Sequence, residues 1–272
     1  MKKTESHSAF IRFIGLEKSF GEKTIYKGVD LAIEKGETMV VLGGSGTGKT
    51  VMLKMLLGLM HPDAGQVLFD GKDVVPMNDE EILQVRRRVG MLFQGGALFD
   101  SLSVAENVAY PLREHFDYSE EELAKIVGEK LELVGLPGIE EMAPSDLSGG
   151  MKKRVSLARA IATNPEVLLY DEPTTGLDPT NIRRIDNLIC DMQKKLNVTS
   201  IVVTHDIQSA FRVADRIALL YNGKIDFVGT KSEAKNSDHE VVRAFLSGEM
   251  DDVEPSASKS KREPVKAKAV KS

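Results

Sequence analysis

A glycine-rich octapeptide combines the residue types that bind phosphate groups. It reads Gly43-Gly44-Ser45-Gly46-Thr47-Gly48-Lys49-Thr50 and matches the pattern G-x-x-x-x-G-K-[ST]. Glycines let the backbone curl until several N–H groups face one anion, and a helix starting near Lys49 adds the positive end of its dipole. Lys49 is therefore expected to reach the β- and γ-phosphates of a nucleotide, and Thr50 to bind Mg²⁺. The alternative is an ordinary glycine-rich turn, which the apolar run before the loop and the helical pattern after it argue against.

Two adjacent carboxylates follow a second apolar run. Val167–Tyr170 has the composition of a buried strand, and Asp171 and Glu172 come directly after it. A buried strand presents such acids rigidly at the edge of a sheet. Asp171 is expected to hold Mg²⁺, and Glu172 to polarise a water molecule for attack on the γ-phosphorus. A solvated Asp-Glu turn is the alternative, and the phosphate-binding loop makes it the weaker one.

A second candidate anion site lies in the segment Leu147–Val155. Ser148, Gly149 and Gly150 open a helical pattern, so a hydroxyl and free N–H groups are available to a phosphate. The segment resembles the signature of ABC ATPases, which usually reads L-S-G-G-Q. Because one nucleotide does not need two γ-phosphate sites in one chain, the resemblance implies a head-to-tail homodimer with two ATP molecules between the subunits. Met151 departs from the usual glutamine, which puts contacts from that position in doubt.

Further elements that resemble the ABC family occur in the expected order over residues 10–250. The resemblance implies that Phe20 stacks on adenine, that Gln94 contacts Mg²⁺ and senses a membrane subunit, and that Asp178 belongs to a loop touching the partner subunit. His205 resembles the switch histidine of the family, which lies near the γ-phosphate of ATP. An aromatic residue in a strand is often simply part of the core, which is the alternative for Phe20. A lone histidine is more often structural, but the position of His205 after a buried strand favours a functional role.

Three blocks are similar to the Mla-type ATPases, which are related to the Mce and toluene-tolerance systems: 94–99, 107–115 and 147–151. This resemblance implies ATP-driven phospholipid transport between inner and outer membranes. It also implies two copies of a separate integral membrane permease, a small accessory subunit and a lipid-binding Mce-type protein. The chain would then be cytoplasmic and peripheral on the inner membrane.

Other functions remain as alternatives. An ABC importer for amino acids or another small solute is the first, although such chains commonly carry glutamine at the position of Met151. Non-transport ABC proteins usually carry two cassettes or long coiled coils, whereas this sequence has one phosphate-binding loop, one signature and no sustained heptads. An inactive scaffold is disfavoured because Lys49, Asp171, Glu172 and His205 are all present.

The strand and helix patterns around these residues predict an α/β fold. Short strands are expected within 10–42, buried strands at 89–93 and 200–204, and a helix over about 49–60. A capping box and helical spacing predict a helix over 120–134, and Asn222-Gly223 predicts a tight hairpin turn. Together with the family resemblance, these features predict a P-loop NTPase of the ABC nucleotide-binding type. It has a RecA-like core, an N-terminal antiparallel β part and a helical subdomain inserted at about 95–160.

Length and composition agree with one such domain. The chain has 272 residues, a formal net charge of −5 and one cysteine. The charge argues against nucleic acid as a partner, the cysteine count suits a reducing compartment, and no apolar stretch reaches the roughly 20 residues of a membrane span. Cys190 is expected to be a small core residue. The domain is predicted to occupy 1–250, with a basic, disordered tail over 251–272.

Overall fold

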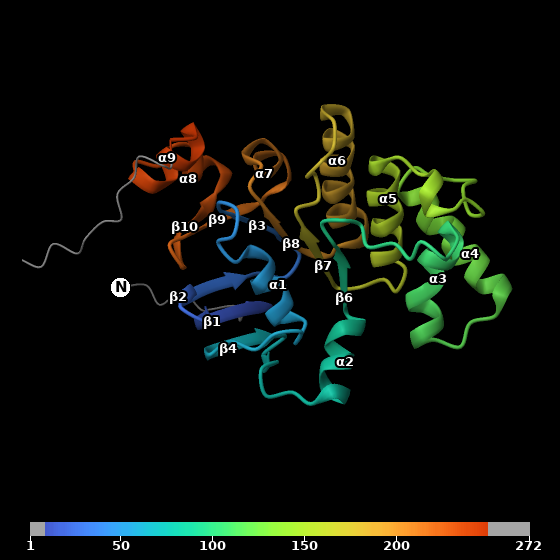
Figure 1. Ribbon diagram of the computed structural model, residues 1–272, viewed down its shortest axis with the longest axis horizontal. Coiled ribbons are helices and arrows are strands. Elements are labelled where there is room, and N and C mark those ends of the chain that lie inside the picture. Colours follow the sequence, from blue (N-terminus) through green and yellow to red (C-terminus); the bar gives the residue numbers. More distant parts are fainter. Residues whose placement is uncertain (1–8, 250–272) are drawn as a thin grey trace, which may run out of the picture.

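A four-stranded antiparallel sheet forms one side of the molecule. The structure is a computed structural model that describes residues 9–249. The strand order in this sheet is β2-β1-β4-β5 (Figure 1). The bounds are β1 Ile11–Phe20, β2 Lys23–Ile33, β4 Ala64–Phe69 and β5 Lys72–Asp73. Instead of the short strands expected from the sequence, β1 and β2 have 10 and 11 residues. Register shifts divide their pairing, one of them next to Gly15, whose φ is 56°.

A six-stranded sheet positions the candidate site residues. Its order is β10-β9-β3-β8-β7-β6, with all neighbours parallel except β10 and β9. The bounds are β3 Thr38–Leu42, β6 Val89–Leu92, β7 Val167–Asp171, β8 Thr199–Thr204, β9 Arg216–Tyr221 and β10 Lys224–Thr230. Parallel strands end at the same edge of a sheet. The phosphate-binding loop, Glu172 and His205 therefore come together after β3, β7 and β8.

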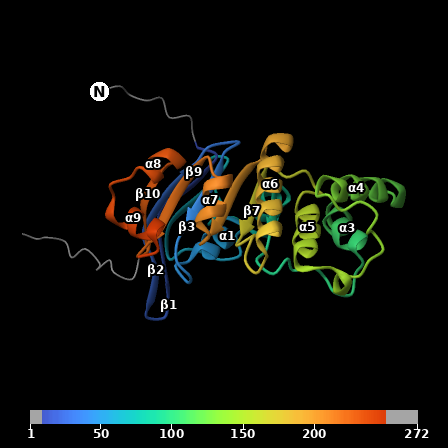
Figure 2. The ribbon, with the colours of Figure 1, turned by 90° about the horizontal axis from the view of Figure 1, so that it is seen from above.

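Both faces of this sheet are buried, as the continuous apolar runs predict. Met39 and Val41 pack into a core shared with the antiparallel sheet and α1, whereas Val40 and Leu42 face a second core that includes α6 and α7. Figure 2 shows α6 and α7 together on one side of the strands. The helices outside the insert are α1 Lys49–Leu56, α2 Asp79–Arg87, α6 Pro179–Leu196, α7 Ile207–Val213, α8 Lys231–Lys235 and α9 Glu240–Ser247.

Three helices lie between β6 and β7 in the sequence and gather at one end of the molecule (Figures 1 and 2). They are α3 Val104–His115, α4 Glu120–Leu133 and α5 Gly149–Ala160, with a short 3₁₀ turn, η1, at Pro144–Asp146. Capping boxes start α3 and α4, and the Ser119–Glu122 box is the one predicted from the sequence. The insert packs on the second core through α3, α4 and α5.

Several expectations from the sequence need correction. The helix expected over 49–60 ends at Leu56, and Gly58 has a φ of 61° with Ile82 packed where a Cβ would lie. Cys190, expected in the core, is only partly buried and packs against the edge of the second core. The Asn222-Gly223 hairpin is confirmed, with Tyr221 paired to Lys224 and positive φ at both turn residues.

Two sequence-based expectations concern membrane spans and the tail. Within residues 9–249, no helix is both long and apolar enough to cross a membrane. The predicted basic tail over 251–272 lies outside the described residues.

Candidate nucleotide-binding and catalytic site

The phosphate-binding loop lies between β3 and α1, as the sequence predicts. Gly46 and Gly48 have φ values of 72° and 104°, which side chains with a Cβ rarely adopt. A Cβ on Gly48 would overlap the side chain of Ile25, so the close approach of β2 also requires glycine here. The hydroxyl of Tyr26 donates to the Gly48 carbonyl at 2.5 Å. Strand β2 thus fixes the loop where it enters the helix.

Lys49 is the buried cation of this site. Its Nζ donates to the carbonyls of Gly43 at 2.8 Å and Gly44 at 2.9 Å, and lies 3.3 Å from Oε1 of Glu172. The ammonium therefore lies inside the loop and beside the carboxylate. This position suits a cation that binds phosphate oxygens at the mouth of the same cavity.

Thr50 and Asp171 form an oxygen pair that could hold Mg²⁺. The Thr50 hydroxyl donates to Oδ1 of Asp171 at 2.8 Å. Burial raises the pKa of Asp171, although the hydrogen bond from Thr50 opposes the rise. A hydroxyl and a carboxylate are hard ligands of the kind that Mg²⁺ takes alongside the phosphate oxygens of a nucleotide. Gln94 lines the same cavity and would add an amide oxygen.

Glu172 lies at the centre of a hydrogen-bonded group. Its backbone has a φ of 47°, and its Oε2 lies 2.9 Å from Nδ1 of His205 and 3.3 Å from the hydroxyls of Thr175 and Thr204. Burial raises the pKa of Glu172, but the hydrogen bond from His205 and the charge of Lys49 outweigh it, so the pKa is lowered overall. Glu172 is thus an ionised carboxylate, the form that can accept a proton from water.

His205 is oriented by this carboxylate. An ionised carboxylate only accepts hydrogen bonds, so Nδ1 carries the proton that it shares with Glu172. Nε2 is then left for another partner, and the side chain is 58% exposed. The orientation suits a histidine that contacts a bound phosphate.

A cavity of about 590 Å³ joins these groups. The predicted site residues that line it are Gly44, Ser45, Gly46, Gly48, Lys49, Thr50, Gln94, Glu172 and His205. Ile25 and Val51 also line the cavity, although no sequence motif identifies them. Gly43, Thr47 and Asp171 lie beside these residues through the contacts of the loop and of Thr50. Phe20 is 45% exposed at the end of β1 and is not among the lining residues found within 9–249, so its adenine contact stays a prediction.

The second candidate anion site is built as the sequence suggests. Ser148 caps α5, and its Oγ accepts a hydrogen bond from the Met151 amide at 3.3 Å. A Cβ on Gly150 would lie 2.6 Å from the Asn181 side chain, so glycine lets α5 approach α6. Asp178 caps α6 and accepts from the amides of Thr180 and Asn181. Among the described residues, those lining the cavity include none of Ser148, Gly149, Gly150 or Asp178.

The chain resembles proteins whose families are known. Residues 26–175 match the model of the ABC transporter family. The chain is 44% identical over 234 residues to the "probable ribonucleotide transport ATP-binding protein mkl" of Mycobacterium leprae, covering 86% of this chain and 67% of the relative. It is 43% identical over 231 residues to the "intermembrane phospholipid transport system ATP-binding protein MlaF" of Haemophilus influenzae, covering 85% of this chain and 88% of the relative.

A solved structure extends the likeness to three dimensions. The dimeric, post-hydrolysis structure of the ATP-binding cassette MJ0796, bound to ADP and Pi, has a TM-score of 0.75 and 33% identity. The match covers 81% of this chain and 98% of that one. The predicted fold class is thereby confirmed as an ABC nucleotide-binding cassette. The chain belongs to the ABC transporter family, as an ATP-binding domain.

Proposed function

We propose that the chain is the ATP-hydrolysing subunit of a transporter that moves phospholipid between the inner and outer membranes. The observation that carries the substrate assignment is the 43% identity to an intermembrane phospholipid transport protein, of which the match covers 88%. The ATPase assignment has independent support from the cavity that joins Lys49, Glu172 and His205. The chain is then expected on the cytoplasmic face of the inner membrane.

The site supports hydrolysis by positioning and proton transfer. Lys49 and the loop amides bind the β- and γ-phosphates. Thr50, Asp171 and Gln94 would hold Mg²⁺, which would neutralise charge on the phosphate oxygens. Glu172 accepts the proton of the attacking water, and its lowered pKa keeps it ionised for that task. His205 holds the carboxylate through Nδ1 and reaches the γ-phosphate through Nε2.

A second copy of the chain completes each site in this proposal. Ser148, Gly149 and Gly150 open a helix whose N-terminus does not line the cavity of its own subunit, and Asp178 caps the neighbouring α6. In a head-to-tail dimer, this edge of one subunit would cover the nucleotide bound by the other. The dimeric MJ0796 cassette supports this arrangement.

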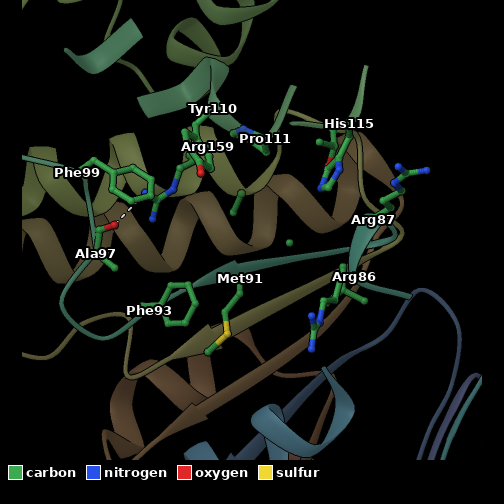
Figure 3. A pocket seen from close by; sticks show the side chains of 14 residues that line it. Arg86, Arg87, Met91, Phe93, Ala97, Phe99, Tyr110, Pro111, His115 and Arg159 are labelled. Carbon is green, nitrogen blue, oxygen red and sulfur yellow. Dashed lines mark hydrogen bonds between the residues drawn. The ribbon is translucent and has the colours of Figure 1, made fainter. Parts of the chain in front are cut away.

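A groove between β6, α3 and α5 is the proposed docking surface of the permease (Figure 3). It has a volume of about 430 Å³ and combines exposed aromatic side chains with cationic ones. The ring of Phe99 lies 4.8 Å from that of Tyr110 and 5.7 Å from the guanidinium of Arg159. Phe99 belongs to block 94–99 and Tyr110 to block 107–115. Two of the three segments that resemble the phospholipid systems therefore contribute to the groove wall, which supports a partner specific to those systems.

The transported substrate can be tested in the whole complex. Vesicles containing the ATPase, its permease and the accessory and Mce-type subunits would be given labelled phospholipid and, separately, labelled amino acids and ribonucleotides. ATP-dependent movement of phospholipid alone is expected. Solute uptake driven by ATP, with lipid movement that ignores ATP, would establish the importer alternative. The ribonucleotide arm is included because of the name of the mycobacterial relative.

A further inference from the structure

Three side chains of α5 bind the backbone of the loop that follows β6. Lys153 donates to the carbonyl of Gln94, Ser156 to that of Gly96, and Arg159 to those of Gly96 at 3.1 Å and Ala97 at 2.8 Å. These donors are spaced three residues apart, so they follow one side of the helix. We call residues 94–99 the Q-loop and these three residues the α5 stripe.

The Q-loop is shaped to receive this stripe. Gly96 has a φ of 79° and Ala97 a φ of 49°, so two consecutive residues of the loop are left-handed. The carbonyls of the same two residues accept hydrogen bonds from Arg159 of α5. A Cβ on Gly96 would lie in van der Waals contact with Oγ of Ser156, at 3.4 Å. Helix α5 also packs tightly on β6, because a Cβ on Gly90 would overlap the backbone of Ala160. The loop and the helix thus fit as one unit.

One end of the stripe reaches the catalytic glutamate. Lys153 is buried, and its Nζ lies 3.4 Å from the carbonyl oxygen of Glu172, besides its bond to Gln94. Burial lowers the pKa of Lys153, which the charges of Asp171 and Glu172 oppose. A single ammonium therefore joins the backbone of the Q-loop to the backbone of Glu172, a residue already held in a left-handed conformation.

The other end of the stripe reaches the groove. Arg159 binds the Q-loop and lies beside the ring of Phe99, and both residues line the groove (Figure 3). Arg159 lies six positions after Lys153, which is about 9 Å along a helix. Helix α5 thereby connects the groove wall with the backbone of Glu172 over a short path.

We propose that Lys153 is a positioning residue, which fixes the main chain of Glu172 to the Q-loop and α5 so that these move as one body. Lys153 does not touch the reacting atoms. It keeps the carboxylate of Glu172 where it can accept a proton, and it ties that position to the wall of the groove. This inference rests on the ATPase function but not on the identity of the transported substrate.

The test separates kcat from KM in the full-length chain. Lys153→Met keeps the length of the side chain but removes the donor, and we expect kcat to fall at least tenfold while KM for ATP changes less than twofold. Lys153→Arg restores a donor and should recover most of kcat. Lys125→Met, at an exposed position of the neighbouring helix α4, is the control and should behave as wild type. Wild-type turnover in the same assay shows separately whether the ATPase function stands.

A second measurement does not depend on activity. Hydrogen exchange of the amides in 94–99 should become faster in Lys153→Met and in Ser156→Ala, and should stay unchanged in Lys125→Met. Unchanged exchange in Ser156→Ala would contradict the proposal that the Q-loop and α5 move as one body. A wild-type kcat in Lys153→Met, or a parallel loss of kcat and nucleotide affinity that Lys153→Arg does not repair, would overturn the role of Lys153.

Discussion

Nζ of Lys49 lies 3.3 Å from Oε1 of Glu172, and both side chains are withdrawn from solvent. The contact joins the phosphate-binding loop directly to the proposed proton acceptor. The charge of Lys49 also contributes to the lowered pKa of Glu172. In the proposed mechanism, one lysine therefore has two tasks, binding phosphate and keeping the carboxylate ionised.

Replacing Lys49 by methionine should impair both tasks. We expect ATP affinity to fall at least tenfold, or about 1.4 kcal/mol, since a charge-assisted contact to phosphate is lost. The free energy of unfolding should drop by about 1–3 kcal/mol, because a buried carboxylate loses one of its partners. Binding of a fluorescent ATP analogue and urea denaturation measure the two effects. Lys72→Met, at an exposed position in β5, is the control, and equal affinities in the two variants would contradict the assignment of Lys49.

Replacing Glu172 by glutamine should separate binding from turnover. The amide keeps the shape of the side chain but cannot accept the proton of water, so kcat should fall about 10²- to 10⁴-fold while ATP still binds. An ATP-bound dimer should then accumulate and elute earlier in gel filtration. Normal turnover in this variant would remove Glu172 from the catalytic role.

Mixing two inactive variants tests the shared site. Lys49→Ala disables the phosphate-binding loop, and Ser148→Arg blocks the signature helix that would cover the partner's nucleotide. In a mixed dimer both defects fall on one site and the other site is intact, so the mixture should regain about a quarter of wild-type activity if the sites act independently. Each parent alone should stay inactive. A mixture no more active than its parents would count against composite sites.

The ion pair between Glu166 and Arg88 should make part of the free energy of unfolding depend on pH. Oε1 of Glu166 lies 2.5 Å from Nε of Arg88, and this hydrogen bond lowers the pKa of Glu166 against the opposing effect of burial. A lowered native pKa gives stability that is complete above the pKa of the unfolded glutamate, about 4.3, and disappears as the pH falls through the native value. Because the pair is partly exposed, its contribution should be only about 0.5–1 kcal/mol.

Chemical denaturation of Glu166→Gln measures this contribution. The variant should be less stable than wild type at pH 7, and the difference should shrink as the pH falls below the unfolded-state pKa of about 4.3 and through the lowered native pKa of Glu166. Glu22→Gln, in the exposed turn between β1 and β2, is the matched control and should show no such change. A difference for Glu166→Gln that persists unchanged in acid would contradict the ion-pair explanation.

The proximity of the candidate site residues could be predicted because they lie at or near the carboxyl ends of buried parallel strands. Asp171 ends β7, His205 follows β8, and Lys49 starts the helix after the loop that follows β3, so an apolar run followed by polar residues is visible in the sequence. Parallel strands then bring these ends together whatever the details of packing. The helix at 120–134 was predictable for a similarly local reason, its capping box.

The remaining features depend on contacts between distant segments. Nothing in the sequence shows that Lys153 reaches the carbonyls of Gln94 and Glu172, 59 and 19 residues away. The early end of α1 depends on Ile82 filling the space beside Gly58. The long, bulged pairing of β1 with β2 depends on the left-handed Gly15, whereas the alternating pattern suggested only short strands.

Phe99→Ala should uncouple transport from ATP binding. Phe99 is 43% exposed, lies against Tyr110 and Arg159 in the groove, and belongs to the loop that the α5 stripe holds. Removing an aromatic anchor of an interface commonly costs about 2 kcal/mol, so permease affinity should fall about thirtyfold. ATP binding by the isolated chain should be unchanged, because Phe99 does not line the nucleotide cavity.

Phe116→Ala is a matched control, since Phe116 is 42% exposed and packs on Tyr118 rather than in the groove. Co-purification with the permease and lipid moved per ATP hydrolysed are the measurements, and equal coupling in both variants would place the permease elsewhere.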